Sequence, residues 1–147
     1  MKSKIIWAVI VVFFLCIALI AYYRKNPLQP ALIINNHRII VEVAVTEAEK
    51  ERGLGYRDSL PPDHGMIFLY DHKDYFPFWM KGMNFPLDFV WIDGDTVVDI
   101  TPEVPVLTGN QISLIKPKVP VDKILELNSG AIMVYGIKIG DKVTFKN

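Results

Sequence analysis

The sequence has a single cysteine, Cys16, so no disulfide can form within the chain and the redox compartment cannot be inferred from cysteine pairing. It also lacks an excess of either charge, with 16 basic and 16 acidic residues. From residue 24 onward, 14 Lys and Arg (all except Lys2 and Lys4) accompany all 16 acids, and no basic stripe is visible. This composition argues against nucleic acid as a partner.

Several catalytic signatures are missing as well. None of Ser59, Ser113 and Ser129 lies in a Gly-x-Ser-x-Gly context, and no glycine loop of the phosphate-binding kind is present. His64 and His72 are predicted at opposite ends of one extended segment, too far apart to share an ion. We therefore predict no metal and no cofactor, and the missing signatures favour a protein that is not an enzyme.

What the sequence does contain is one long hydrophobic run. Residues 5–23, "IIWAVIVVFFLCIALIAYY", form an uncharged stretch of 19 residues. As a helix this stretch would be roughly 28 Å long, close to the thickness of a bilayer's hydrocarbon core. Basic residues flank it on both sides, and its last two residues are tyrosines, which are enriched at membrane interfaces. This pattern predicts a single membrane-spanning helix after a short tail, residues 1–4.

A cleaved signal peptide is the alternative for this run. Signal peptides usually have a shorter apolar core and a cleavage site with small residues. Here Ala18 and Ala21 are three residues apart, but bulky tyrosines follow them. We therefore favour an uncleaved signal anchor, a linker over residues 24–31 and a single domain over residues 32–147. The free amino terminus adds slightly to the positive charge before the helix, which favours placing the domain on the extracytoplasmic side.

Short strands separated by turn signals dominate the predicted domain. A hairpin around Asn35-Asn36 comes first, and a helix is predicted over 46–53. The strands that follow are predicted over 66–70, 76–81, 87–92, 96–101 and 123–128, with "DHKD" as a turn, a proline-containing loop over 101–121 and a short helix over 129–136. The segment 137–145 is predicted to contain a turn at Gly140-Asp141 and then a closing strand. The fold class that we predict is mainly β: a small antiparallel barrel or sandwich with one or two short helices, preceded by the single transmembrane helix.

Two charged residues stand out within the apolar segment "FWMKGMNFPLDFVWID". If "GMNFP" closes a hairpin, Lys81 and Asp88 meet at its mouth, and a salt bridge is the simplest outcome. Such a pair could simply order the hairpin. It could instead form the polar floor of a ligand pocket with Trp79 as a wall. The residues alone leave both interpretations open.

At these residues the sequence resembles a known family. The segments "GLGYRDSL", "GMIFLYD", "FWMKGMNFPLD", "ILELNSG" and "GIKIGDKV" occur in the order and spacing of the domain of unknown function 192 family, over roughly residues 32–147. The resemblance implies a compact, mainly β domain, often preceded by a signal peptide or membrane segment, and it implies no reaction. The family's polar signature falls on Arg57, Lys81, Asp88 and Glu126, beside Trp79 and Met80. Gly55, Gly82 and Met83 depart from its pattern.

These residues lead to three hypotheses about function. The first is a membrane-anchored extracytoplasmic accessory domain that binds a small ligand or an envelope partner through Arg57, Trp79, Lys81, Asp88 and Glu126. The second is an uncharacterised hydrolase or lyase in which Asp88 or Glu126 is the acid or base. The third is a purely structural protein of the envelope. The first hypothesis requires the charged groups to border a cavity.

Overall fold

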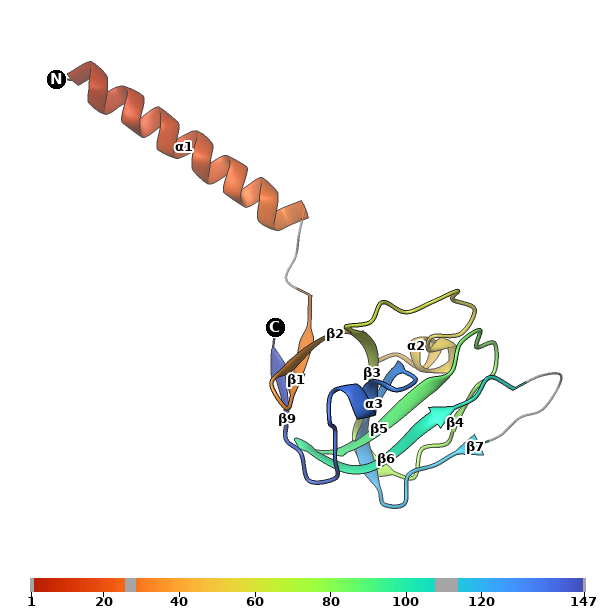
Figure 1. Cartoon of the computed structure of the whole chain (residues 1–147). Helices are drawn as coiled ribbons and strands as arrows, with labels where there is room; N and C mark the ends of the chain where they lie inside the picture. The colour runs from red at the N-terminus through yellow and green to blue at the C-terminus, as the bar shows by residue number, and fades with distance from the viewer. Residues whose placement is uncertain (1, 26–28, 108–113, 147) are drawn as a thin grey trace.

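Figure 1 shows the fold in a computed structural model of the chain, which describes residues 2–25, 29–107 and 114–146. The helices are α1 (Lys2–Lys25), α2 (Glu47–Arg52) and α3 (Ala131–Val134). The strands are β1 (Ala31–Ile34), β2 (His37–Ala44), β3 (His64–Asp74), β4 (Phe78–Trp79), β5 (Leu87–Asp93), β6 (Thr96–Val104), β7 (Leu114–Ile115), β8 (Val121–Asn128) and β9 (Val143–Lys146). The prediction of a mainly β domain with short helices is confirmed.

The main sheet has seven strands in the order β6-β5-β8-β3-β2-β1-β9. It curls into a half-barrel, and its two edges meet at one end. There Val97 N donates to Asp141 O at 2.9 Å, and Val143 N donates to Asp95 O at 2.8 Å. An isolated bridge joins Thr96 to the segment leading into β9. These contacts shield part of both edges from pairing with other chains.

All neighbouring strands of the main sheet run antiparallel except β2 and β3, which run parallel. The prediction of a purely antiparallel sheet is therefore wrong for this pair. A parallel neighbour needs a crossover connection. The chain supplies one with α2 and the loop after it, so α2 is carried onto a face of the sheet (Figure 1).

The central strands are buried on both faces, which explains why β5 reads as an almost continuous apolar run. Val90 and Ile92 face a cluster that includes α3 and Ile137. Phe89 and Trp91 face a second cluster on the other side of the sheet, where β4, β7 and the loop after α2 cover it. The side chains of β5 therefore alternate between the two faces of the sheet.

Local signals locate several elements correctly. Asn35 and Asn36 form the β1–β2 turn with φ of 50° and 65°, as the hairpin prediction requires.

The predicted "DHKD" turn is wrong, because β3 continues through it with a register shift between Leu69 and Asp74. The predicted strand 76–81 shrinks to β4, which pairs with β7 and not with β5. "GMNFP" therefore closes no hairpin.

The N-terminal run forms α1, and the apolar side chains described along it are exposed, from Trp7 to Ile20. Figure 1 shows this helix standing apart from the domain. In the parts of the chain that the structure describes, no helix is both long and apolar enough to cross a membrane. The predicted transmembrane helix therefore has no support from the structure. Of the predicted linker, residues 26–28 lie outside the described residues, as do residues 108–113 of the predicted loop.

Candidate functional site

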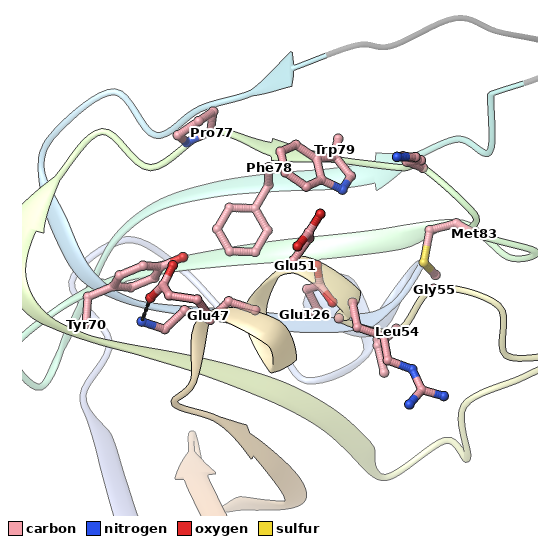
Figure 2. A pocket seen from close by; sticks show the side chains of 14 residues that line it. Glu47, Glu51, Leu54, Gly55, Tyr70, Pro77, Phe78, Trp79, Met83 and Glu126 are labelled. Carbon is pink, nitrogen blue, oxygen red and sulfur yellow. Dashed lines mark hydrogen bonds and ion pairs between the residues drawn. The ribbon is translucent and has the colours of Figure 1, made fainter.

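A pocket of about 290 Å³ lies between α2 and β4, on the face of the sheet that carries Phe89 and Trp91 (Figure 2). We call it the α2–β4 pocket. Its lining includes three acidic residues, three basic residues and an aromatic wall. Tyr70, Phe78, Trp79, Lys81, Met83 and Glu126 are among the lining residues. Its volume is at the small end of the range for ligand sites, about 300–1,000 Å³. A ligand of this pocket would have to be small.

Local sequence fixes α2 at the rim of the pocket. Thr46 Oγ1 accepts a hydrogen bond from Glu49 N at 3.3 Å, and Glu49 Oε2 accepts one from Thr46 N at 2.9 Å. This is a capping box, and it satisfies backbone donors that the helix leaves unpaired. The helix ends at Gly53, whose φ of +50° favours glycine.

An ammonium group of the protein itself lies at this rim. Lys50 Nζ is 3.1 Å from Glu47 Oε1 and 4.1 Å from the centroid of the Tyr70 ring. Burial, and after it the charges of Glu47 and Glu126, raise the pKa of Tyr70 to about 12, so its phenol is neutral at physiological pH. The sequence analysis missed these rim residues. The spacing of Glu47 and Lys50 could have suggested an ion pair, but the contact with Tyr70 depends on tertiary structure.

The far wall of the pocket is aromatic. Phe78 packs edge-on against Phe68, with ring centroids 4.8 Å apart, and against Phe89 and Trp91 at 5.8 Å. These contacts fix the position of β4 over the sheet. Trp79, its neighbour on β4, is 38% exposed, and Figure 2 shows its ring above the pocket. The prediction that Trp79 walls a pocket agrees with this position.

Glu126 forms the floor of the pocket. It lies on β8, opposite Met66 of β3 and Phe89 of β5, and it is only 4% exposed. Its Oε2 atom has no hydrogen-bond partner among the described residues. Burial raises the pKa of this carboxyl to about 8, although the charge of Arg57 acts in the opposite direction. The group is therefore mostly protonated at neutral pH.

A glycine leaves room directly beside this carboxyl. A Cβ atom placed on Gly53 would lie 3.7 Å from Glu126 Oε2 and 3.4 Å from Phe68 Cζ. The end of α2 thus comes within van der Waals distance of the acid without a side chain between them. Figure 2 shows Glu126 between the turn after α2 and the aromatic wall.

Arg57 and Glu126, which belong to the same polar signature, do not pair with each other. The two terminal nitrogens of Arg57, Nη1 and Nη2, both donate to the carboxylate of Glu42, and the distance from Nη2 to Oε2 is 2.8 Å. This bidentate pair raises the pKa of Arg57 and lowers that of Glu42. Arg57 is not part of the pocket lining, and it influences Glu126 only through its charge.

The prediction that Asp88 pairs with Lys81 is also wrong. Asp88 is fully buried on the opposite face of the sheet from Glu126. Its Oδ1 accepts from Glu103 N at 2.7 Å and its Oδ2 from Ile132 N at 2.8 Å. Asp88 therefore holds α3 and β6 in place through backbone groups. The four residues of the polar signature therefore do not form one network, and the pocket lining contains only Lys81 and Glu126 of them.

Lys81 is exposed at the rim, next to two of the positions that depart from the family pattern. At Gly82 a Cβ atom would lie 2.8 Å from Tyr56 Cζ, so the ring packs on the bare backbone there. Met83 is buried and lines the pocket with an apolar side chain. Gly82 and Met83 therefore both suit the packing contacts at these positions.

No group of three or more His, Cys, Asp and Glu residues arranged to hold a metal ion is found within residues 2–25, 29–107 and 114–146. The chemistry available in the pocket is that of one buried carboxyl, a set of aromatic rings and exposed ions at the rim.

Solved structures share this fold. A proposed transcription regulator from Sinorhizobium meliloti 1021 is 33% identical with a TM-score of 0.70, over 79% of this chain and 91% of its own. A protein of unknown function from Novosphingobium aromaticivorans DSM 12444 is 32% identical with a TM-score of 0.71, over 78% of this chain and 83% of its own. No curated protein matches the sequence. A family model described as "Uncharacterized ACR" matches residues 31–145, and this chain belongs to that family, the domain of unknown function 192 family.

Proposed function

We propose that this domain binds a small ligand in the α2–β4 pocket and that Glu126 is the main polar contact. The observation that carries the proposal is the Oε2 atom of Glu126, which is buried at the pocket floor without a described partner. Leaving such an atom unpaired costs about 1–3 kcal/mol. A ligand that satisfies it would recover part of that cost on binding.

A thermal-shift screen of the full-length protein against small molecules tests the proposal. A bound ligand at 100 times its Kd stabilises the folded state by about 2.7 kcal/mol. We expect Glu126→Gln and Trp79→Ala to reduce that stabilisation and Lys81→Ala to reduce it for acidic ligands. Lys138→Ala, on an exposed lysine outside the pocket lining, is the control.

The same screen addresses a purely structural role in the envelope. In that case no ligand stabilises the protein, and the pocket variants change its unfolding midpoint only as much as their packing requires. A ligand that binds wild type and the Glu126→Gln and Trp79→Ala variants equally would place binding elsewhere on the molecule.

A second candidate function is acid or base catalysis by Glu126. The pKa of about 8 favours it, because a catalytic carboxyl works best with a pKa near the operating pH. Of the two acids predicted for this role, Asp88 is no candidate, because both of its oxygens accept backbone hydrogen bonds in the core. Catalysis predicts turnover of a bound compound that Glu126→Gln abolishes while binding persists. Binding without turnover would count against it.

We also propose that residues 5–23 attach the protein to a membrane, with the domain on the extracytoplasmic face. The support is the uncharged sequence of this run and the exposed apolar side chains of α1. In cells, the full chain should stay in the membrane fraction after alkaline carbonate washing, whereas residues 29–147 should be released. A protease added outside intact spheroplasts should digest the domain. Release of the full chain by carbonate would contradict membrane attachment. Protection of the domain from the protease would contradict its placement on the extracytoplasmic face.

A further inference from the structure

The shape and charge of the α2–β4 pocket also indicate the class of ligand. We propose that it takes a small organic amine whose ammonium group contacts Glu126 and whose carbon skeleton packs against Phe78 and Trp79. This inference rests on the proposed function and adds the chemistry of the ligand to it.

The floor of the pocket supports a cationic group. Glu126 is only 4% exposed, and its Oε2 atom lacks a described hydrogen-bond partner. The nearby guanidinium of Arg57 is held by Glu42 in a bidentate pair, so it gives Glu126 no hydrogen bond. A buried acid in this state accepts either a proton or a cation. An ammonium group of a ligand supplies both the charge and the hydrogen-bond donor.

The walls support the same type of ligand. Tyr70, Phe78 and Trp79 line the same pocket as Glu126, and Figure 2 shows the Trp79 ring above the Glu126 side chain. Aromatic faces attract ammonium groups and also pack well against the carbon atoms that carry them. A carboxylate combined with aromatic rings therefore recognises an amine through two different interactions.

The protein shows this chemistry at its own rim. Lys50, an alkylammonium, lies between the carboxylate of Glu47 and the ring of Tyr70, at 3.1 and 4.1 Å. The proposed ligand would make the corresponding pair of contacts with Glu126 and the wall of β4. Lys50 is thus an internal example of a cation held by an acid and an aromatic ring in the same pocket.

Arg52 and Lys81 also line the pocket and would repel a cation. Both side chains are exposed at the rim, where water and salt screen them. The raised pKa of Glu126 keeps this carboxyl protonated in the free pocket at neutral pH, and binding of the ammonium group releases the proton to solvent. The resulting carboxylate is out of water, where its charge interacts about fourfold more strongly than in bulk solvent at an effective dielectric of about 20. Exposed Glu51 further offsets the positive rim. The buried acid therefore decides which charge is preferred.

Calorimetric titration with three compounds of one skeleton tests this choice. Phenethylamine carries the ammonium, 2-phenylethanol replaces it with a neutral hydroxyl, and 3-phenylpropionate carries an anion. The full-length protein is titrated in a nonionic detergent, and the detergent-only titration is subtracted. We expect phenethylamine to bind at least about tenfold more tightly than 2-phenylethanol, the size of one good charge-assisted contact. 3-Phenylpropionate should bind more weakly still.

Two variants assign the effect to the pocket floor. Glu126→Gln keeps the shape of the side chain and should remove the preference for the amine, so that phenethylamine and 2-phenylethanol bind alike. Glu51→Gln removes an exposed acid from the same rim and should leave most of the preference intact. The unfolding curve of each variant verifies that it is folded before titration.

The possible outcomes separate this inference from the proposed function. Equal or tighter binding of the alcohol or the carboxylate overturns the amine assignment and leaves a ligand pocket in place. An amine preference that survives Glu126→Gln overturns the role of Glu126. Failure of phenethylamine to bind overturns the amine assignment, and the broader thermal-shift screen then decides whether the pocket binds anything.

Discussion

Glu126 and Asp88 are both buried acids on neighbouring strands, yet their surroundings give them opposite characters. Asp88 accepts two backbone N–H groups, each within 2.8 Å. Glu126 accepts no described hydrogen bond at Oε2, and burial raises its pKa to about 8. One acid is therefore structural and the other is available for a ligand or a proton.

The raised pKa of Glu126 predicts how stability depends on pH. The folded state holds this proton up to about pH 8, whereas the unfolded chain, with the ordinary pKa of 4.5, releases it earlier. Between these values the folded state binds more protons, so the free energy of unfolding falls as pH rises, by at most about 1.4 kcal/mol per pH unit. Urea unfolding at pH 5, 6.5 and 8 measures this. Glu126→Gln should flatten that decline, and Glu51→Gln should not.

Removing Asp88 should have a different and larger effect at neutral pH. Asp88→Ala leaves two buried N–H groups without acceptors, at about 1–3 kcal/mol each, so we expect a loss of about 2–6 kcal/mol in the free energy of unfolding. Chemical denaturation at pH 7 is the measurement. Asp58→Ala, on an exposed acid, should change stability by less than about 0.5 kcal/mol. Similar small losses in both variants would mean that Asp88 does not support α3 and β6 in this way.

At the scale of elements, short pieces of structure position the pocket. α2 has six residues, too few for an isolated helix to be stable. Its capping box and its packing over the sheet hold it in place. β4 has two residues, pairs with β7, and is fixed by the Phe78 ring. A substitution that destabilises α2 or β4 should therefore also alter the rim of the pocket.

The cap of α2 can be tested directly. Thr46→Ala removes the side-chain acceptor for Glu49 N and should cost about 1 kcal/mol in urea unfolding. Thr46→Ser retains the hydroxyl and should cost much less. If ligand binding depends on α2, the alanine variant should also weaken it. Equal stability of both variants would show that the cap is dispensable.

Gly82, in the turn after β4, and Gly94, in the turn between β5 and β6, form a matched pair of glycines. Gly82 and Gly94 have φ of 72° and 58°, but only Gly82 has a ring where a Cβ would be, with Tyr56 Cζ at 2.8 Å. Each change to alanine carries the backbone strain of positive φ, about 1–3 kcal/mol. Gly82→Ala should cost more in unfolding experiments because Tyr56 must also move. A second Tyr56→Ala substitution should remove that excess, and equal costs without it would refute the contact.

At the scale of the whole molecule, both apolar clusters lie between residues 31 and 143. The side chains described in α1 are exposed and belong to neither cluster. Folding of the domain is thus expected to be independent of the N-terminal helix.

A fragment of residues 29–147 tests this independence. We expect a single cooperative unfolding transition whose midpoint in urea matches that of the domain in the full chain, since no described core contact is lost. Circular dichroism and tryptophan fluorescence should give coincident curves. A non-cooperative transition would mean that residues before 29 contribute to the core.

The sequence alone determined the features that depend on neighbouring residues. The Asn35-Asn36 turn, the capping box of α2 and the two faces of β5 follow from local backbone preferences and from alternation along a strand. The family also follows from ordered local segments, and residues 31–145 match it. Of the five candidate site residues named from the sequence, Trp79, Lys81 and Glu126 line one pocket, whereas Arg57 and Asp88 do not.

Only the tertiary structure decided which side of the sheet each charge occupies and which group it meets. Because β4 pairs with β7 and not with β5, Lys81 does not lie next to Asp88. Arg57 forms its ion pair with Glu42 on β2, the strand that runs parallel to β3. These partners are far apart in sequence, and the charge of a residue does not specify its distant neighbour. Glu126 Oε2 lacks a described partner for the same reason: its neighbours come from segments far apart in the sequence, and none of the described ones donates a hydrogen bond to it.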